Sequence, residues 1–247
     1  MSPPFEARGG VAVIVLAAGT GQRMSAPMNK IFLRLGGRPI LQRTLEEFSR
    51  IPAVTRIITV AAPIDRATCE ILVEEGQFSK PHTFVAGGPT RHASEFNGLL
   101  ALADDIASGA IDVVLIHDAV RPFVSRAEVE QLVEKAREVG AAIPVVPAGD
   151  RLVTLQEDGT VHPAEDDLWM AQTPQAFRAA MVLEAHRRAA AEGFAGTDTS
   201  SVVERTGQEV VVLIGRRENI KITTADDMVM AELIADEVDN GRTLAME

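Results

Sequence analysis

The sequence predicts an α/β fold in which helices pack on both faces of a doubly wound, mainly parallel β-sheet, with a β-hairpin arm protruding from it. Short apolar runs rich in Val and Ile lack the alternation of a half-exposed strand. Segments with apolar residues at helical spacing lie between these runs. Strands that alternate with helices form right-handed crossovers, so they predict a parallel sheet with ligands bound at the carboxyl ends of its strands.

The strands and helices follow one another along the whole chain. The predicted buried strands cover residues 11–17, 56–61, 112–117, 141–146 and 209–214. The predicted helices contain residues 41–48, 96–103, 129–136 and 224–238. Ser125 and Glu128 have the spacing of a capping box at the start of the third helix, and Thr224 and Asp227 have it at the start of the last one.

One polar segment, residues 147–168, interrupts this alternation. It contains two short alternating runs around Asp158-Gly159, a dipeptide typical of a type I′ hairpin turn. A hairpin this polar has little core of its own, so it is either an arm or lid that contacts another surface or a solvated insertion. We expect residues 1–247 to form one domain, with 147–168 inserted as the arm.

Composition excludes several classes of protein. The 247-residue chain has a net charge of −11 and no run of Lys or Arg longer than two, which argues against a nucleic-acid-binding surface. No apolar run approaches the roughly 18 residues of a membrane-spanning helix. Cys69 is the only cysteine, which excludes an intramolecular disulfide and fits a cytoplasmic location. The histidines show neither metal-ligand spacing nor a partner serine for a hydrolytic triad.

The loop after the first strand, VIVLAAGTGQRMSAPMNK at residues 13–30, is rich in glycine and small residues. Met24 stands where a dinucleotide fingerprint needs a third glycine or another small residue, and no ribose-binding acid follows. The P-loop pattern is absent. The third type of phosphate-binding loop is one whose backbone wraps a nucleoside triphosphate. Arg23 and Lys30 would then bind its phosphates, and the alternative is that both are solvated loop charges.

Two further clusters lie at expected strand ends, the first of them after a short strand that precedes Gly87. AGGPTRHASEFNG, residues 86–98, places Gly88 before Arg91 and Ser94 at the start of a helix, where backbone amides favour an anion or a base edge. LIHDAVRPF, residues 115–123, ends its strand at Asp118. That carboxylate is a candidate ligand for Mg²⁺ or a ribose hydroxyl, and the alternative is a turn cap.

The motifs together resemble one family, the cytidylyltransferases that activate phosphorylated polyols, above all the 2-C-methyl-D-erythritol 4-phosphate cytidylyltransferases of the non-mevalonate isoprenoid pathway. The resemblance runs from about Val11 to the last helix. It depends on LAAGTGQRM followed by Asn29-Lys30, GG with RxxS, HDAVRP, QTPQAF, GTD and NIKIT. It implies a Rossmann-like nucleotidyltransferase sheet.

The resemblance also implies roles for particular residues. Arg23 and Lys30 match the catalytic pair that neutralises the triphosphate and the pentacovalent α-phosphorus. The expected CTP-binding residues are Ala17, Ala18, Gly19, Gly21, Gly88, Arg91, Ser94 and Asp118. The expected acceptor-binding residues are Arg121, Arg151, Thr173 and Lys221. Asp118 is also the expected metal ligand.

The arm departs from the family pattern at two positions. Asp150-Arg151 stands where Asp-Thr is common, and Glu165 stands where an Arg commonly contacts the acceptor phosphate. Because an ionised acid repels a phosphate dianion, we expect Arg151 to take over that contact.

We therefore expect a cytoplasmic homodimeric enzyme that transfers a cytidylyl group from CTP to methylerythritol 4-phosphate with Mg²⁺ and releases pyrophosphate. The arm is expected to reach the neighbouring subunit's site, and neither nucleic acid nor membrane is an expected partner. The alternatives are a cytidylyltransferase for ribitol 5-phosphate or another pentitol phosphate, a nicotinamide-dependent oxidoreductase, and a nucleotide-binding module without activity.

Overall fold

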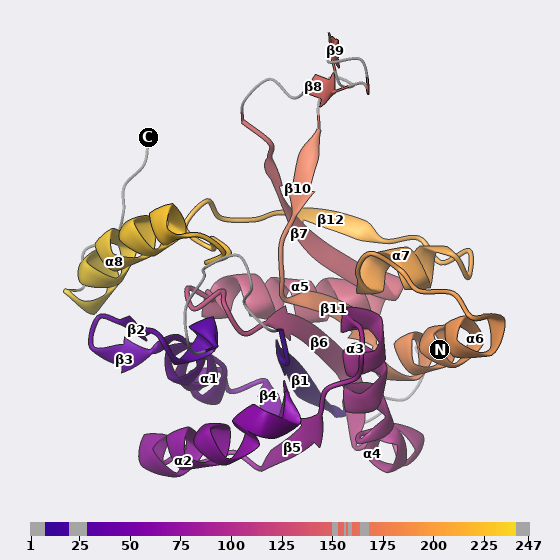
Figure 1. The fold of residues 1–247 in the computed structure, drawn as a ribbon. Coiled ribbons are helices and arrows are strands. Elements are labelled where there is room, and N and C mark those ends of the chain that lie inside the picture. The colour runs from indigo at the N-terminus through magenta and orange to yellow at the C-terminus, as the bar shows by residue number, and fades with distance from the viewer. Residues whose placement is uncertain are drawn as a thin grey trace.

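The computed structural model describes residues 8–19, 29–149, 153–155, 157, 160–163 and 168–240. A largely parallel sheet forms its centre (Figure 1). Strand β1 (Gly10–Ala17) lies between β4 (Val54–Ala61) and β6 (Ile111–Asp118), parallel to both. β5 (His82–Ala86) pairs with β4 on the outer side. The apolar runs predicted for β1, β4 and β6 are buried on both faces, as expected for a parallel sheet.

The other half of the sheet is mixed. β7 (Ala141–Pro147) pairs in parallel with β12 (Val211–Ile214), as the apolar runs predict. The prediction that the second of these strands is buried is wrong, because Val212 and Ile214 of β12 are exposed. On its other side β7 pairs with two antiparallel strands that the sequence did not predict, β10 (Trp169–Ala171) and β11 (Gln175–Arg178). Because β11 also pairs with β6, it joins the two parallel halves.

Helices cover both faces of the sheet, as expected (Figure 1). One face is covered by α1 (Ile40–Arg50), α2 (Arg66–Gly76), α5 (Arg126–Val139) and α8 (Ala225–Asp239). The other is covered by α3 (Arg91–Leu100), α4 (Ala103–Ala107), α6 (Ala179–Glu192) and α7 (Thr199–Glu204). Short elements fill the connections, namely the 3₁₀ turns η2 (Lys30–Phe32) and η3 (Pro63–Asp65) and the strands β2 (Arg34–Leu35) and β3 (Arg38–Pro39).

The two predicted capping boxes have different outcomes. At α8, Thr224 and Asp227 exchange the expected hydrogen bonds. At α5 the prediction is wrong, because Ser125 occupies the N-cap position without a side-chain hydrogen bond. Glu128 is instead buried near the charges of Arg121 and Arg216, and its carboxylate oxygens make no hydrogen bond. Tertiary surroundings override the local capping pattern there.

The predicted arm forms a hairpin of β8 (Val153–Leu155) and β9 (Val161–Pro163). Figure 1 shows this hairpin projecting beyond the ends of β7 and β10, away from the body of the molecule. The predicted turn at Asp158-Gly159 lies outside the described residues. Among the helices in the described part of the chain, none has the length and apolar character needed to cross a bilayer.

Candidate active site

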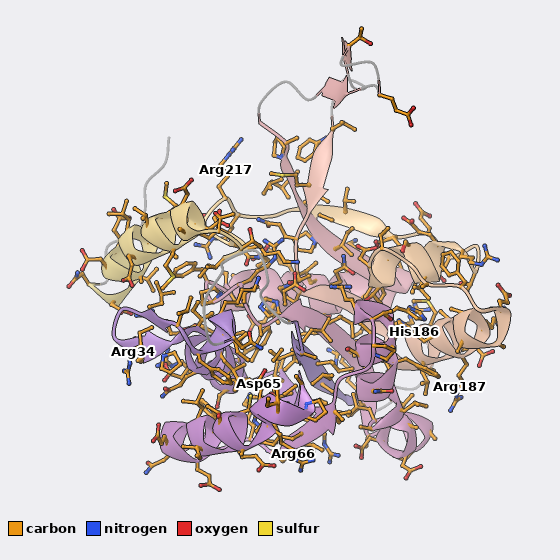
Figure 2. The ribbon with its side chains drawn as sticks, viewed as in Figure 1. Arg34, Asp65, Arg66, His186, Arg187 and Arg217 are labelled. Carbon is orange, nitrogen blue, oxygen red and sulfur yellow. The ribbon has the colours of Figure 1, made fainter. Side chains whose placement is uncertain are left out.

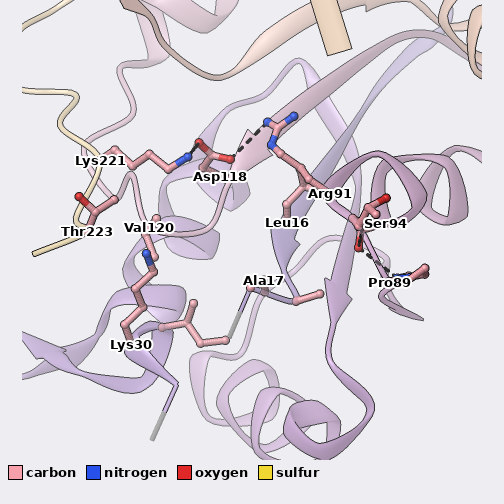
Figure 3. Close-up of a pocket in the computed structure, with 15 residues that line it drawn as sticks. Leu16, Ala17, Lys30, Pro89, Arg91, Ser94, Asp118, Val120, Lys221 and Thr223 are labelled. Atoms are coloured by element: carbon pink, nitrogen blue, oxygen red, sulfur yellow. Dashed lines mark hydrogen bonds and ion pairs between the residues drawn. The ribbon is translucent and has the colours of Figure 1, made fainter. Parts of the chain in front are cut away.

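A cavity of about 470 Å³ opens at the carboxyl ends of β1, β5 and β6, where a doubly wound sheet binds its ligands (Figure 3). Many residues singled out from the sequence line it: Ala17, Ala18, Gly19, Lys30, Gly88, Arg91, Ser94, Asp118 and Lys221. The fold thus brings together side chains and backbone from four separate segments of the sequence.

The loop after β5 shows why glycine is required there. A Cβ atom on Gly87 would lie 2.4 Å from the Cβ of Ala18, and one on Gly88 would lie 2.5 Å from the Cβ of Ala93. The Ser94 hydroxyl accepts a hydrogen bond from the Gly88 amide at 3.1 Å and donates to the Thr90 carbonyl at 3.0 Å. The buried Ser94 therefore ties this loop to the start of α3.

Asp118 is the electrostatic centre of the cavity. Its carboxylate lies 2.9 Å from Lys221 Nζ, 3.3 Å from Arg91 Nη2 and 3.7 Å from Arg121 Nε. Figure 3 shows Lys221 and Arg91 approaching it from opposite sides. Burial alone raises the pKa of this carboxyl, but the surrounding cations outweigh burial and hold the pKa far below its usual range. Asp118 is therefore ionised and holds these cations in place.

Arg91 connects Asp118 to a second buried acid. Its guanidinium also forms an ion pair with Glu95, one turn further along α3. Glu95 is 1% exposed, and its pKa is raised to about 7 because the cost of burial exceeds the attraction of Arg91. Nothing in the sequence pattern distinguished Glu95 from an exposed helical acid.

A chain of hydrogen bonds supports Asp118 from behind. Its backbone amide donates to Thr173 Oγ1 at 3.1 Å, and this hydroxyl lies 3.1 Å from His117 Nδ1. His117 Nε2 lies 3.0 Å from the Arg121 carbonyl oxygen, which fixes it as the donor and leaves Nδ1 to accept from Thr173. Burial lowers the pKa of His117 to about 4. His117 is thus a neutral histidine of the protein core.

Arg121 and Thr173 do not line the cavity. Arg121 Nη1 donates to the Asn219 carbonyl at 2.6 Å, and Asn219 Nδ2 donates to the Thr173 carbonyl at 2.9 Å. These bonds join the ends of β6 and β10 to the segment that carries Lys221. In this structure the two predicted acceptor ligands hold the cavity wall rather than form its surface.

Lys30 lies at the start of η2 and points into the cavity towards Val120 (Figure 3). Asn29 caps this turn by accepting from the Ile31 amide at 3.3 Å, while its side-chain amide donates to Asp65 at 2.8 Å. The turn is therefore anchored on both sides, so the base of the Lys30 side chain has a defined position.

Some predicted residues lie outside the described ones: Gly21, Arg23, Arg151 and the departure at Glu165. Conversely, the cavity includes residues that the sequence patterns did not assign, among them Ile31, Pro89, Thr90 and Val120. Thr90 had a detectable signal, since it caps α3 by accepting from the Ala93 amide at 3.0 Å.

Among the residues that the structure describes, none form a resident Mg²⁺ site in the cavity. Asp118 is surrounded by cations, and no cluster of three or more His, Cys, Asp or Glu ligands lies beside it in the described part of the chain. Mg²⁺ requires oxygen ligands in an octahedral arrangement. The structure therefore does not favour Asp118 as the ligand of a protein-held metal ion.

Comparison with known proteins gives a consistent result. Residues 11–237 match the family model described as 2-C-methyl-D-erythritol 4-phosphate cytidylyltransferase. Similar proteins of that name include those of Geobacter metallireducens, 47% identical over 90% of this chain and 96% of that protein, and Geotalea uraniireducens, 45% identical over 94% and 99%. A crystal structure of 4-diphosphocytidyl-2C-methyl-D-erythritol synthase from Anaerococcus prevotii covers 93% of this chain at 29% identity with a TM-score of 0.79. A Thermus thermophilus 2-C-methyl-D-erythritol 4-phosphate cytidylyltransferase structure covers 92% at 30% identity with a TM-score of 0.71.

Proposed function

The chain belongs to the 2-C-methyl-D-erythritol 4-phosphate cytidylyltransferase family, and we propose that it transfers the cytidylyl group of CTP to the phosphate of 2-C-methyl-D-erythritol 4-phosphate, releasing pyrophosphate. This reaction belongs to the non-mevalonate route to isoprenoid precursors. The single observation that supports it best is the cavity at the carboxyl ends of the strands, where glycine backbone faces the cations Lys30, Arg91 and Lys221.

The β1 and β5 loops form the nucleotide side of this proposal. Ala17, Ala18, Gly19 and Gly88 line the cavity with little or no side chain, so a ligand can approach their backbone groups closely. Backbone donors and acceptors can read the edge of cytosine, and Ser94 keeps the Gly88 amide in position. Gly21 and Arg23 complete the nucleotide-binding loop.

The reaction is an in-line displacement. An oxygen of the acceptor phosphate attacks the α-phosphorus of CTP, a new P–O bond forms, and pyrophosphate leaves with the electrons of the broken bond. A phosphate monoester is already anionic at neutral pH, so no general base is required. The protein must bring two polyanions together and stabilise added charge, for which fixed cations are suited. We assign this role to Lys30 and Arg23.

The acceptor lies on the side of Lys221, with Arg151 of the arm as a further phosphate ligand. Asp118 holds Lys221 at 2.9 Å, so the ammonium is oriented before the substrate arrives. Arg121 and Thr173 serve the acceptor indirectly, because they fix the segment around Asn219 that precedes Lys221.

Mg²⁺ enters as part of the nucleotide substrate in this proposal. A triphosphate supplies the oxygen ligands that this ion prefers, while the cations around Asp118 occupy its carboxylate. The protein's own contribution to charge neutralisation is then made by Lys30, Arg23 and Lys221.

We further propose that residues 1–247 form one nucleotidyltransferase domain that works as a cytoplasmic homodimer, with the arm reaching a neighbouring site. The hairpin projects from the body, and apolar side chains are exposed near its base. Trp169 is 49% exposed, Met170 51% and Ile214 of β12 72%. A second copy of the chain would cover this surface.

Pyrophosphate release by the purified chain tests the reaction. We expect turnover with CTP, Mg²⁺ and methylerythritol 4-phosphate, and little with ribitol 5-phosphate or other pentitol phosphates. Faster turnover with a pentitol phosphate would show that this compound, and not methylerythritol 4-phosphate, is the acceptor. Thermal stabilisation by NAD but not by CTP with Mg²⁺ would favour the oxidoreductase, and CTP binding without turnover of any acceptor would leave a binding module.

A further inference from the structure

We propose that His92, Glu95 and His186 form a binding site for a divalent transition-metal ion, Zn²⁺ by the chemistry of its ligands, at the contact between α3 and α6. One ligand atom from each of the three side chains lies within 4.8 Å of the others. This site is separate from the CTP cavity and goes beyond the transfer reaction proposed above.

The burial of these side chains supports a binding site. His186 is 0% exposed and Glu95 is 1% exposed, and Figure 2 shows His186 where α6 faces α3. Both ring nitrogens of His186 and both of His92 are buried without a hydrogen-bond partner. A buried polar atom without a hydrogen bond costs folding free energy, so these four neighbouring nitrogens require an explanation. Binding of a metal ion by the two rings would explain them.

The ligand types are correct for zinc. Two imidazoles and one carboxylate form a common zinc-binding set. Burial is the main cause that lowers the pKa of His186, to about 3, and it also lowers the pKa of His92. Both rings are therefore neutral, which is the form that binds metal ions.

Glu95 can serve the metal ion and Arg91 at the same time. Its Oε1 pairs with Arg91, while its Oε2 lies 3.7 Å from His186 Nε2. Two ligands of a tetrahedral zinc ion lie about 3.4 Å apart when each metal–ligand distance is about 2.1 Å. The pair from Glu95 and His186 is thus already close to that separation.

His92 is the ligand that must move. Its ring stacks on that of His186 with centroids 4.6 Å apart and an interplanar angle of 13°. Because lone pairs of imidazole lie in the plane of the ring, two stacked rings do not converge on one ion. The three ligand atoms lie within 4.8 Å of one another, so bringing them to about 3.4 Å requires a change of at most roughly 1.4 Å in any separation, with His92 turning out of the stack. His92 is only half-buried, so it is the ligand with room to turn.

The charged groups around the site are Arg91 and, more distantly, Asp198 and Asp118. Arg91 bonds Glu95 with one nitrogen and Asp118 with the other. A metal ion on Glu95 would therefore be separated from the nucleotide cavity by a single guanidinium group.

The experiment uses the full-length chain without a histidine tag, treated with a chelator, dialysed and then titrated with Zn²⁺ in the absence of nucleotide. We expect about one tightly bound ion per chain, a rise in melting temperature on addition of Zn²⁺, and visible absorption from the Co²⁺ form. In His92→Gln the affinity should fall by at least about tenfold, and the temperature shift and Co²⁺ absorption should disappear.

His82→Gln is the matched control, because His82 lies on β5 with its Nε2 2.8 Å from Thr59 Oγ1, away from the cluster. This variant should bind Zn²⁺ as the unaltered chain does. Circular dichroism shows whether His92→Gln is folded. If the unaltered chain binds no Zn²⁺, or if folded His92→Gln binds it equally well, the proposal is wrong.

Discussion

The cavity rim and the arm are both expected to contact substrate, but they are held in different ways. The rim is cross-linked to the core, since Asp118 at the end of β6 joins Arg91, Arg121 and Lys221. In the described part of the arm, β8 and β9 pair only with each other. The rim can therefore be preorganised within one chain, whereas the arm requires another surface to define its position. This difference predicts that donor chemistry depends on the rim and that acceptor binding is shared between the two regions.

Lys30→Ala tests whether the rim carries the chemistry, and it has the largest expected effect. Removing a fixed cation from the transferring phosphoryl group should lower kcat by about 10³, because a preorganised charge acts mainly on the transition state. Pyrophosphate release measures kcat, and the melting temperature should stay unchanged. Lys135→Ala is the matched control, since Lys135 pairs with Glu138 on the outer surface of α5. Near-normal turnover by Lys30→Ala would remove Lys30 from the reaction.

Lys221→Ala tests the share of the rim in acceptor binding. A charge-assisted contact with phosphate contributes about 1.5–3 kcal/mol, so we expect the KM for methylerythritol 4-phosphate to rise by about 10- to 100-fold. The KM for CTP should change much less. Lys221→Arg, which keeps the charge, should recover part of the loss. An acceptor KM unchanged in Lys221→Ala would place the acceptor phosphate elsewhere.

Arg151→Ala tests the share of the arm, and we expect a smaller rise in acceptor KM, about tenfold, with kcat and the KM for CTP maintained. Arg126→Ala on α5 is the control, because Arg126 forms an exposed pair with Glu130. If the acceptor KM does not move in Arg151→Ala while kcat holds, the arm does not replace the missing phosphate ligand through this residue.

The sequence predicts one group of strands and misses another. Strands β1, β4, β6 and β7 were predictable because burial on both faces leaves a continuous apolar run. Strand β12 was found from the same kind of run, although Val212 and Ile214 are exposed. The antiparallel strands β10 and β11 were missed because they are short and carry no periodic pattern. Their existence depends on pairing with β7 and β6, which no local signal records.

Site residues, too, could be predicted only where a local motif marks them. Gly88, Ser94 and Asp118 were predictable because each belongs to a motif at the carboxyl end of a strand: Gly88 follows β5, Ser94 lies in the first turn of α3, and Asp118 ends β6. The contact between Glu95 and His186 was not, since it arises only when α3 packs on α6. The absence of metal-ligand spacing among the histidines was a sound observation about sequence, yet the fold brings two of them together with Glu95.

Thr224→Ala has the smallest expected effect. It tests whether a residue that stabilises the fold beside the rim also affects substrate binding. Thr224 Oγ1 accepts from the Asp227 amide at 3.2 Å and caps α8 directly after the cavity residue Thr223. Loss of an N-cap side chain costs about 1 kcal/mol of folding free energy, measurable by urea unfolding, and Thr224→Ser should restore it. Thr223 keeps both of its own bonds to Asp227 Oδ2, at 2.8 Å from the amide and 2.7 Å from the hydroxyl, so kcat and both KM values should stay unchanged. A rise in acceptor KM would show instead that the cap positions Lys221, and the rim would then be less rigid than its cross-links indicate.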